Sequence, residues 1–216
     1  EALTRALDQL AKERGTADLT GFTVNIQRVS LTDDPSRTAT LEAAKDAKAA
    51  GAIITYDPNY RPALWLSEED AVRWMREPLG MVDVLKISDE ETTLLSGFKA
   101  PEAAAEALTA KGIRLVLVTL GPDGVYYRYA PKDGGEVRTG TVPGFQVQVA
   151  DTNGAGDTFF GAFLSKLCKR ENGLAGFTAD ELEADLTFAN RAASLTTSKP
   201  GAIPAMPTLE EVEAAL

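Results

Sequence analysis

Residues 151–167 read DTNGAGDTFFGAFLSKL, with two glycines and two aspartates directly before an apolar run. The apolar residues of that run recur at helical spacing, so the stretch predicts a tight turn followed by a helix. The alternating FQVQV at 145–149 predicts a strand ahead of the turn. Backbone N–H groups in the first turn of a helix lack intrahelical partners, and glycine lets a bulky anion approach them. Gly154, Ala155 and Gly156 therefore form a candidate anion-binding turn.

Asp157 is the unexpected residue in this turn, because its carboxylate would repel a phosphate bound to the same amides. One interpretation gives it a task, which is to accept a proton from a hydroxyl that attacks the phosphate. The alternative is that Asp157 only stabilises the helix N-terminus, while the glycines only form a tight turn. The residue types alone leave both interpretations open.

The composition narrows the class of function. The chain has 216 residues, a formal net charge of -10 and no histidine. The acidic balance argues against nucleic acid and anionic membranes as partners, since both draw affinity from basic patches. Without histidine, acid–base chemistry falls to a carboxylate or a lysine, and hydrolase triads are excluded. No apolar run approaches the roughly 18 residues of a spanning helix. With no charged-then-apolar leader and a single Cys168, a cytoplasmic location is expected.

The hydrophobic patterning predicts an α/β fold. Three short apolar runs, AIITYD, VDVLKI and RLVLVTL, are separated by helical patterns and predict parallel strands buried on both faces. Three later runs, GVYYRYA, EVRTGTV and FQVQV, predict an antiparallel meander at the edge of the same sheet. In chain order the six runs occupy residues 52–57, 82–87, 114–120, 124–130, 136–142 and 145–149. Helices are predicted over residues 1–14, 35–50, 67–77, 88–97, 101–111, 155–170, 178–198 and 208–216.

The stretch DTNGAGDTF (151–159) resembles the D-T-x-G-A-G-D-x-F signature of the PfkB carbohydrate kinase family, which includes ribokinase and fructokinase. The resemblance implies that Asp157 is the catalytic base and that the amides of residues 154–156 hold the transferred phosphate. It also implies that Asp151 helps to hold a monovalent cation, expected to be potassium, beside that turn. No Walker A loop occurs in the chain. The longer pattern favours the catalytic interpretation of Asp157.

Two segments upstream of this turn are also similar to family motifs. YDPNYRPALW (56–65) looks like a D-x-N-x-R stretch, which places Asn59 and Arg61 at the sugar or the transferred phosphate. KISDEETTLLSG falls where the family carries N-x-x-E, so Glu91 takes the position that organises magnesium, with Ser88 in place of the asparagine. The alternative is that the first segment is only a proline-fixed turn and that Glu91 lies on the exposed face of a helix start.

Two further segments resemble motifs on the nucleotide side of the family. VTLGPDG is similar to V-T-x-G-x-x-G, which implies that Thr119, Gly121 and Gly124 meet phosphate or ribose. FANRAASLTTSKPGA is similar to the adenine-side helix and loop, which implies that Asn190 and Gly201 lie closest to the base. Taken alone, VTLGPDG also fits a plain strand and β-turn.

The resemblance implies a three-layer α/β/α ribokinase-like, Rossmann-like fold whose sheet is mostly parallel with an antiparallel edge. The N-terminal third of the family, with its first strands, Gly-Gly substrate motif and β lid, has no counterpart, and the resemblance begins near Val29. We therefore expect an unassigned segment over residues 1–28 and a partial nucleotide-binding domain over residues 29–216.

The function that the resemblance implies is that of an ATP-dependent sugar kinase, most like a fructokinase, which transfers the γ-phosphate of ATP to a sugar hydroxyl. ATP, Mg²⁺ and K⁺ are the expected cofactors, ATP and a small sugar are the expected partners, and a homodimer is left open. One alternative is a truncated, non-catalytic half that binds nucleotide without transferring phosphate. A second is specificity of the 2-keto-3-deoxygluconate kinase or ribokinase type.

Overall fold

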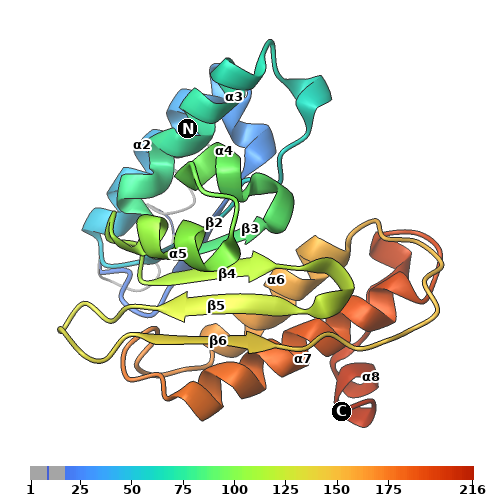
Figure 1. The fold of residues 1–216 in the computed structure, drawn as a ribbon. Helices are drawn as coiled ribbons and strands as arrows, with labels where there is room; N and C mark the ends of the chain where they lie inside the picture. Colours follow the sequence, from blue (N-terminus) through green and yellow to red (C-terminus); the bar gives the residue numbers. More distant parts are fainter. Residues whose placement is uncertain (1–8, 10–17) are drawn as a thin grey trace.

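The computed structural model describes residue 9 and residues 18–216. A six-stranded sheet forms its centre, and the strands lie side by side in chain order (Figure 1). They are β1 (Thr23–Gln27), β2 (Ile53–Asp57), β3 (Val84–Ser88), β4 (Leu115–Thr119), β5 (Val125–Tyr129) and β6 (Arg138–Val142). β1 to β4 pair in parallel, whereas β4, β5 and β6 pair antiparallel. The expected α/β sheet, mostly parallel with an antiparallel edge, is confirmed.

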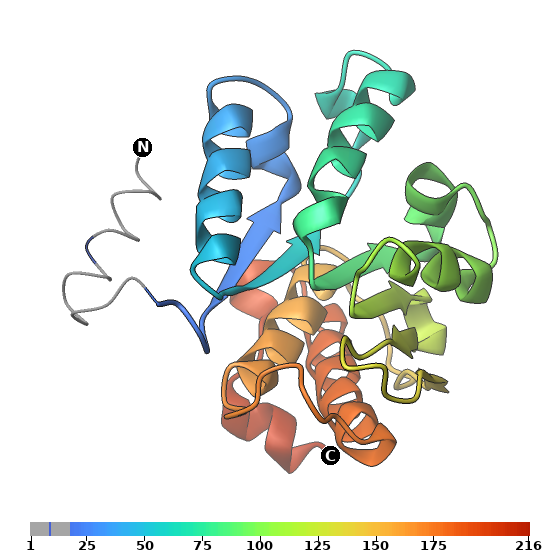
Figure 2. The same ribbon diagram turned by 90° about the vertical axis from the view of Figure 1, so that its left-hand side faces the viewer.

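Helices cover the two faces of the sheet as separate layers (Figure 2). One layer contains α2 (Ser36–Ala49), α3 (Glu68–Arg76), α4 (Thr92–Ser96) and α5 (Pro101–Thr109). The other contains α6 (Ala155–Leu167) and α7 (Ala179–Thr197), with α8 (Leu209–Ala214) packed against α7. Short 3₁₀ turns are η1 (Arg28–Leu31), η2 (Pro62–Leu64), η3 (Glu77–Met81), η4 (Asp89–Glu91), η5 (Gly121–Asp123) and η6 (Ile203–Ala205).

Successive residues of the central strands supply two separate hydrophobic cores. Leu85 and Ile87 of β3 belong to the core shared with α2 to α5, whereas Val84 belongs to the core shared with α6 and α7. Val116 and Leu117 of β4 divide between the two cores in the same way. Because both faces are buried, these strands read as nearly continuous apolar runs in the sequence.

Side-chain caps fix where the last two helices begin. The Thr178 hydroxyl accepts a hydrogen bond from the Glu181 amide at 3.2 Å, and the Glu181 carboxylate accepts one from the Thr178 amide at 3.0 Å. Thr208 and Glu211 form the same reciprocal pair at the start of α8. Each box satisfies two backbone donors that a helix end would otherwise leave unpaired.

The predicted strand at 145–149 is wrong, because this segment has no strand pairing. Pro143 follows β6 directly and has no N–H with which to continue a ladder. The Asn190 side chain of α7 donates to the last carbonyl of β6 and to that of Pro143, each at 3.1 Å. These two acceptors are therefore paired with α7 and not with a further strand. The alternating pattern instead marks a segment that lies against α7, where the Phe145 ring centroid is 3.6 Å from the Arg191 guanidinium carbon.

β1 is a strand that the sequence analysis did not predict. It pairs in parallel with β2 along its whole length and lies at the edge of the sheet. The helix predicted over residues 1–14 lies outside the described residues, apart from residue 9. Within the part of the chain that the structure describes, no helix combines the length and the apolar character needed to cross a membrane.

We expect Phe163→Ala to lower the free energy of unfolding by about 3–5 kcal/mol, because its fully buried ring joins α6 to the sheet. Phe98→Ala is the matched control: that ring is 51 % exposed, so its loss should change stability by no more than about 0.5 kcal/mol. Urea unfolding of the two variants beside the wild type measures the difference. Equal losses would contradict the packing described here.

Candidate functional site

The carboxyl ends of the parallel strands meet the first turn of α6 at one edge of the sheet. β2, β3 and β4 end at Asp57, Ser88 and Thr119. Lys86, near the end of β3, reaches α6 so closely that a Cβ added to Gly156 would lie 3.0 Å from its Nζ. Ligands of open α/β sheets bind outside the carboxyl ends of the strands. The predicted anion-binding turn therefore lies where this fold places ligands.

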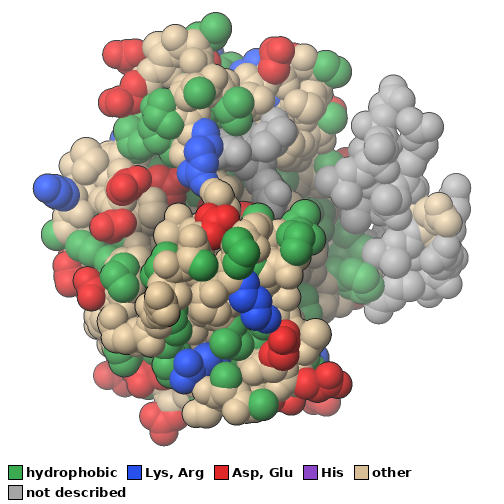
Figure 3. Space-filling model, turned by 90° about the vertical axis from the view of Figure 1, so that its right-hand side faces the viewer, with side chains coloured by type: hydrophobic (Ala, Val, Ile, Leu, Met, Phe, Trp, Pro, Cys, Tyr) green, Lys and Arg blue, Asp and Glu red, His purple; other side chains and the backbone are tan. Residues whose placement is uncertain are grey.

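The face of the molecule toward which these strand ends point carries both signs of charge. Acidic and basic side chains are interspersed there with hydrophobic ones and do not gather into a single charged patch (Figure 3). Because the whole chain carries a net charge of -10, its overall field does not attract an anion. Affinity for a phosphate at this edge must come from groups that lie close to it.

The backbone of the first turn of α6 requires glycine at its start. Gly154 is the N-cap and adopts φ +79°, a left-handed conformation that other residues rarely adopt. A Cβ at this position would also lie 3.1 Å from the Cβ of Ala202. In the described structure no side chain caps this helix start. A helix start without a side-chain cap can offer its N–H groups and its positive dipole end to an external anion.

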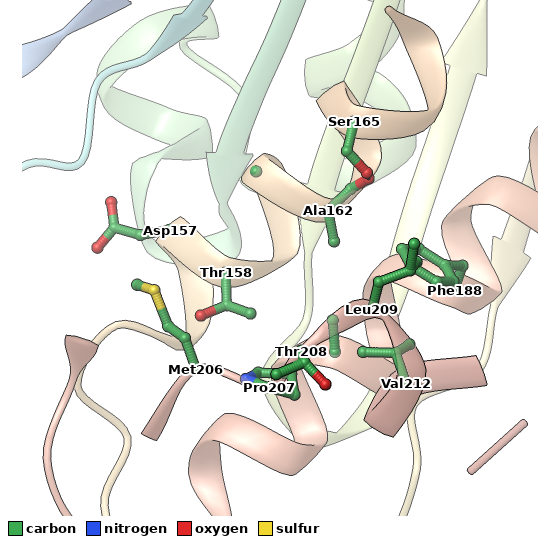
Figure 4. Close-up of a pocket in the computed structure, with 12 residues that line it drawn as sticks. Asp157, Thr158, Ala162, Ser165, Phe188, Met206, Pro207, Thr208, Leu209 and Val212 are labelled. Atoms are coloured by element: carbon green, nitrogen blue, oxygen red, sulfur yellow. The ribbon is translucent and has the colours of Figure 1, made fainter. Parts of the chain in front are cut away.

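Asp157 is exposed in this turn and also lines a cavity of about 250 Å³ between α6, α7 and α8. Figure 4 shows its carboxylate at one end of the cavity, pointing away from Thr158 and Met206. The hydrogen bonds found among the described side chains include none to the Asp157 carboxylate. The group is thus placed to accept a proton from a ligand, although its charge also favours the helix start.

Asp57 and Lys86 form a buried ion pair directly beneath this turn. The Lys86 ammonium lies 3.1 and 3.3 Å from the two carboxylate oxygens, and the residues are 5 % and 2 % exposed. Burial raises the pKa of Asp57 to about 6, against the lowering effect of Lys86. The negative charges of Glu91 and Asp157 contribute to this rise, so both carboxylates lie close enough to act on Asp57.

The sequence analysis predicted no role for Asp57 or Lys86. Asp57 lies in the YDPNYRPALW motif and Lys86 in the KISDEETTLLSG motif. The available signal was a lysine inside the otherwise apolar run of β3, since a buried lysine needs a partner. Asp57, the last residue of the neighbouring strand, was the partner within reach. Only the alignment of β2 with β3 brings the two together.

Glu91 is 4 % exposed, so the alternative that it lies on an exposed helix face is wrong. One carboxylate oxygen accepts from the Tyr60 amide, and the other accepts from the Ser88 amide at 2.7 Å and the Ser88 hydroxyl at 3.0 Å. Three of the roughly four acceptor positions of a carboxylate are therefore occupied. A carboxylate that accepts these hydrogen bonds does not fit direct coordination of magnesium. It fits a structural role in which Glu91 ties η4 to the segment before η2.

That segment carries the two residues predicted to contact substrate. Asn59 adopts φ +42°, an uncommon left-handed conformation for a residue with a side chain. Arg61 is exposed, and its guanidinium donates to the Tyr60 carbonyl at 3.0 Å. Because Glu91 holds the Tyr60 amide, it sets the position of both predicted contacts.

Asp151 joins the loop before α6 to the loop that contains Gly201. Its two oxygens accept from the Asn153 amide at 2.9 Å and from the Gly201 amide at 3.1 Å. These backbone hydrogen bonds lower the pKa of the Asp151 carboxyl. Carboxylate oxygens suit hard cations, so Asp151 fits the predicted role, and the described residues contain no cluster of three or more metal-ligating side chains.

A second cavity, of about 300 Å³, lies between the 143–152 segment and α7. Gly121 and Asn190, two of the residues predicted to bind nucleotide, line it, and so does Ala155 in the first turn of α6. Its volume is at the low end of those known for small-ligand sites. The cavity therefore opens beside the candidate anion-binding turn, and Phe145 lies on its wall.

Thr119, Gly124 and Gly201 do not line this cavity. The Thr119 hydroxyl donates to the Ile87 carbonyl at 3.3 Å, and the Gly201 amide is held by Asp151. A Cβ at Gly124 would lie 2.1 Å from the Val142 carbonyl oxygen, so glycine is needed there for backbone packing. The structure thus gives these three residues structural partners, and their contact with nucleotide stays a prediction.

Comparison with known proteins supplies the context for this arrangement. The sequence profile of the pfkB family carbohydrate kinases matches residues 8–209. The chain belongs to this family. Fructokinase-1 of Zea mays is 40 % identical over 185 residues, which cover 85 % of this chain and 55 % of that protein. The chain spans about half the length of such curated relatives.

Solved structures of known kinases share the fold. A fructokinase double mutant from Vibrio cholerae O395, solved with fructose, ADP and potassium, is 28 % identical with a TM-score of 0.80, covering 90 % of this chain and 60 % of that one. A putative ribokinase II from E. coli, in complex with ATP and Mg²⁺, is 27 % identical with a TM-score of 0.72, covering 89 % and 57 %. The expected family and its ribokinase-like fold are confirmed.

The raised pKa of Asp57 predicts a pH-dependent effect of Asp57→Asn. Between about pH 4 and pH 6 the folded protein holds a proton on Asp57 that the unfolded chain has released, so this residue makes the wild type less stable as pH rises. Asparagine does not titrate, so the stability of the variant relative to the wild type should rise over this interval by on the order of 1–3 kcal/mol. Urea unfolding of both proteins at pH 4, 5, 6 and 7 measures it, and a constant difference would contradict the raised pKa.

Proposed function

We propose that this chain supplies the nucleotide side of an ATP-dependent sugar kinase, which transfers the γ-phosphate of ATP to a sugar hydroxyl as a fructokinase does. Membership of the pfkB family and the fructokinase relatives support this proposal. The observation that carries it is the first turn of α6. A left-handed glycine opens an uncapped helix at the carboxyl edge of the sheet, with a carboxylate in the same turn and a cavity beside it.

Most of the predicted residues have a role in the proposed reaction. The amides of residues 154–156 and the dipole of α6 stabilise negative charge on the transferring phosphoryl group. Asp157 accepts the proton of the sugar hydroxyl. The hydroxyl oxygen bonds to the γ-phosphorus while ADP departs. Asn59 and Arg61 contact the sugar or the phosphoryl group from the segment that Glu91 holds. Gly121 and Asn190, which line the second cavity, contact the nucleoside.

Two metal ions belong to the proposal because solved relatives contain them. Bound magnesium supplies charge neutralisation for the phosphates of ATP. Glu91 has about one acceptor position left and could reach such an ion only through water. Asp151 is the residue here that would hold potassium, next to the anion-binding turn. A sugar of the ribokinase or 2-keto-3-deoxygluconate kinase type in place of fructose is the second specificity to test.

The experiment that tests the function combines binding and transfer. Labelled ATP, Mg²⁺, K⁺ and a panel of fructose, ribose and 2-keto-3-deoxygluconate report phosphate transfer, and calorimetry with ATP reports binding. Transfer to fructose supports the fructokinase assignment, and transfer to another sugar corrects the specificity. Binding without transfer to any sugar would establish the non-catalytic alternative for this chain, and no binding would reject the proposal.

We expect Asp157→Asn to lower kcat at least ~10²-fold, the low end for loss of one positioned base, while ATP affinity stays level or improves. Affinity is spared because the carboxylate repels the γ-phosphate in the ground state. Asp180→Asn is the matched control, since Asp180 is an exposed carboxylate in the first turn of α7. Should both variants lose only roughly 0.3–1 kcal/mol of stability and keep their turnover, Asp157 merely stabilises the helix.

We expect Gly156→Ala to weaken ATP binding, because the added Cβ would press on the Lys86 ammonium and narrow the approach to the turn. Gly161→Ala, in the same helix, is the matched control, because a Cβ there meets nothing within 4 Å. Calorimetric titration with ATP should show a loss of about tenfold or more for the first variant and no change for the second. Equal affinities in two folded variants would reject the anion-binding turn.

A further inference from the structure

Lys86 is a buried cation at the candidate site whose role the proposed reaction leaves open. Among the side chains whose burial the structure describes, it is the only buried lysine or arginine. Its Nζ lies 3.1 Å from the nearer oxygen of Asp57, and a Cβ on Gly156 would lie 3.0 Å from the same nitrogen. The ammonium therefore contacts both the carboxylate of β2 and the first turn of α6.

Stability of the fold does not account for this pair. Removing two charges from water costs about as much as their mutual attraction returns, and apolar residues of similar volume often replace a buried pair without loss. The neighbouring positions of β3, Leu85 and Ile87, are apolar and fully buried. A buried ion pair at the ligand-binding edge of a sheet instead points to a functional role.

The charge balance around the turn indicates what that role is. The negative charges of Glu91 and Asp157 both act on Asp57 here, and all three carboxylates oppose a bound polyanion. Lys86 brings a positive charge beside the N-terminus of α6, where it adds to the partial positive charge of the helix. A lysine serves phosphates as a point charge, so it can act through the turn.

We propose that Lys86 is a positioning residue for the phosphate that binds at the first turn of α6, and that Asp57 holds its ammonium against Gly156. The inference rests on the proposed function and deepens it. Glycine at position 156 then leaves room for the ammonium, since a Cβ there would lie 3.0 Å from its Nζ. Asp57 also offsets part of the lysine charge, so the two members of the pair have opposite effects on the anion.

The opposite effects of Asp57 and Lys86 on anion affinity provide the test. Asp57→Asn keeps an oxygen that can accept from Lys86 but removes the offsetting charge, so affinity for ATP should rise about threefold or more. The double variant Asp57→Asn with Lys86→Met loses both charges and should bind ATP about tenfold more weakly than the wild type. AMP, whose single phosphate carries less charge, should change less in both variants. Calorimetric titrations with ATP and AMP at constant salt measure the two ratios.

The matched control neutralises a comparable pair at the opposite end of β3. Lys48 and Asp83 are joined there, and the carboxylate also accepts from the Lys132 ammonium at 3.2 Å and from the Ile54 amide at 3.0 Å. Asp83→Asn with Lys48→Met should leave the ratio of ATP to AMP affinity unchanged. If Asp57→Asn and the double variant weaken ATP and AMP binding alike, or if the control shifts the ratio equally, Lys86 is only structural and the inference fails.

The failure of the inference can be told apart from failure of the proposed function. A wild-type chain that binds no ATP rejects both, because there is then no phosphate to position. A wild-type chain that binds ATP with an affinity that neither variant changes rejects the role of Lys86 alone. If the double variant does not fold, Asp57→Asn with Lys86→Gln takes its place, since the glutamine amide can hydrogen-bond the asparagine amide and carries no charge. ATP binding no weaker than that of Asp57→Asn alone then rejects the role of Lys86.

Discussion

Burial of β2, β3 and β4 on both faces is the constraint on which the rest of the structure depends. Parallel strands need crossover connections, and α2, α3 and the α4–α5 pair all cross on the same face. The second face is left to α6 and α7, which follow the antiparallel edge in the chain. The chain must therefore return beneath the parallel strands, and this return brings the start of α6 to their carboxyl ends.

Much of this organisation can be predicted from sequence, because two-sided burial leaves unbroken apolar runs such as that of β4. The pattern fails where burial is partial. In β1, only Val24 and Ile26 are apolar between polar neighbours, and an edge strand of this kind resembles a loop. In FQVQV, period-two alternation indicates a segment covered on one side, but it carries no information about a hydrogen-bonding partner.

The residues of the candidate site also differ in whether the sequence could predict them. The glycine turn and Asp157 could be found because the chemistry lies in consecutive residues. Asp57 and Lys86 are 29 positions apart and meet only through the alignment of two strands, which a single sequence does not show. Glu91 illustrates a third case: its position was found, but the hydrogen bonds that occupy it come from Ser88 and from another segment, at Tyr60.

The carboxylate of Glu91 has a thermodynamic consequence for whatever binds beside it. It anchors the Tyr60 amide to the end of β3, so the chain that presents Asn59 and Arg61 is already ordered before a ligand arrives. Immobilising a flexible loop on binding costs conformational entropy, which subtracts from the observed affinity. Here that entropy is lost during folding, and the free energy of the contacts made by this segment can appear in the dissociation constant almost in full.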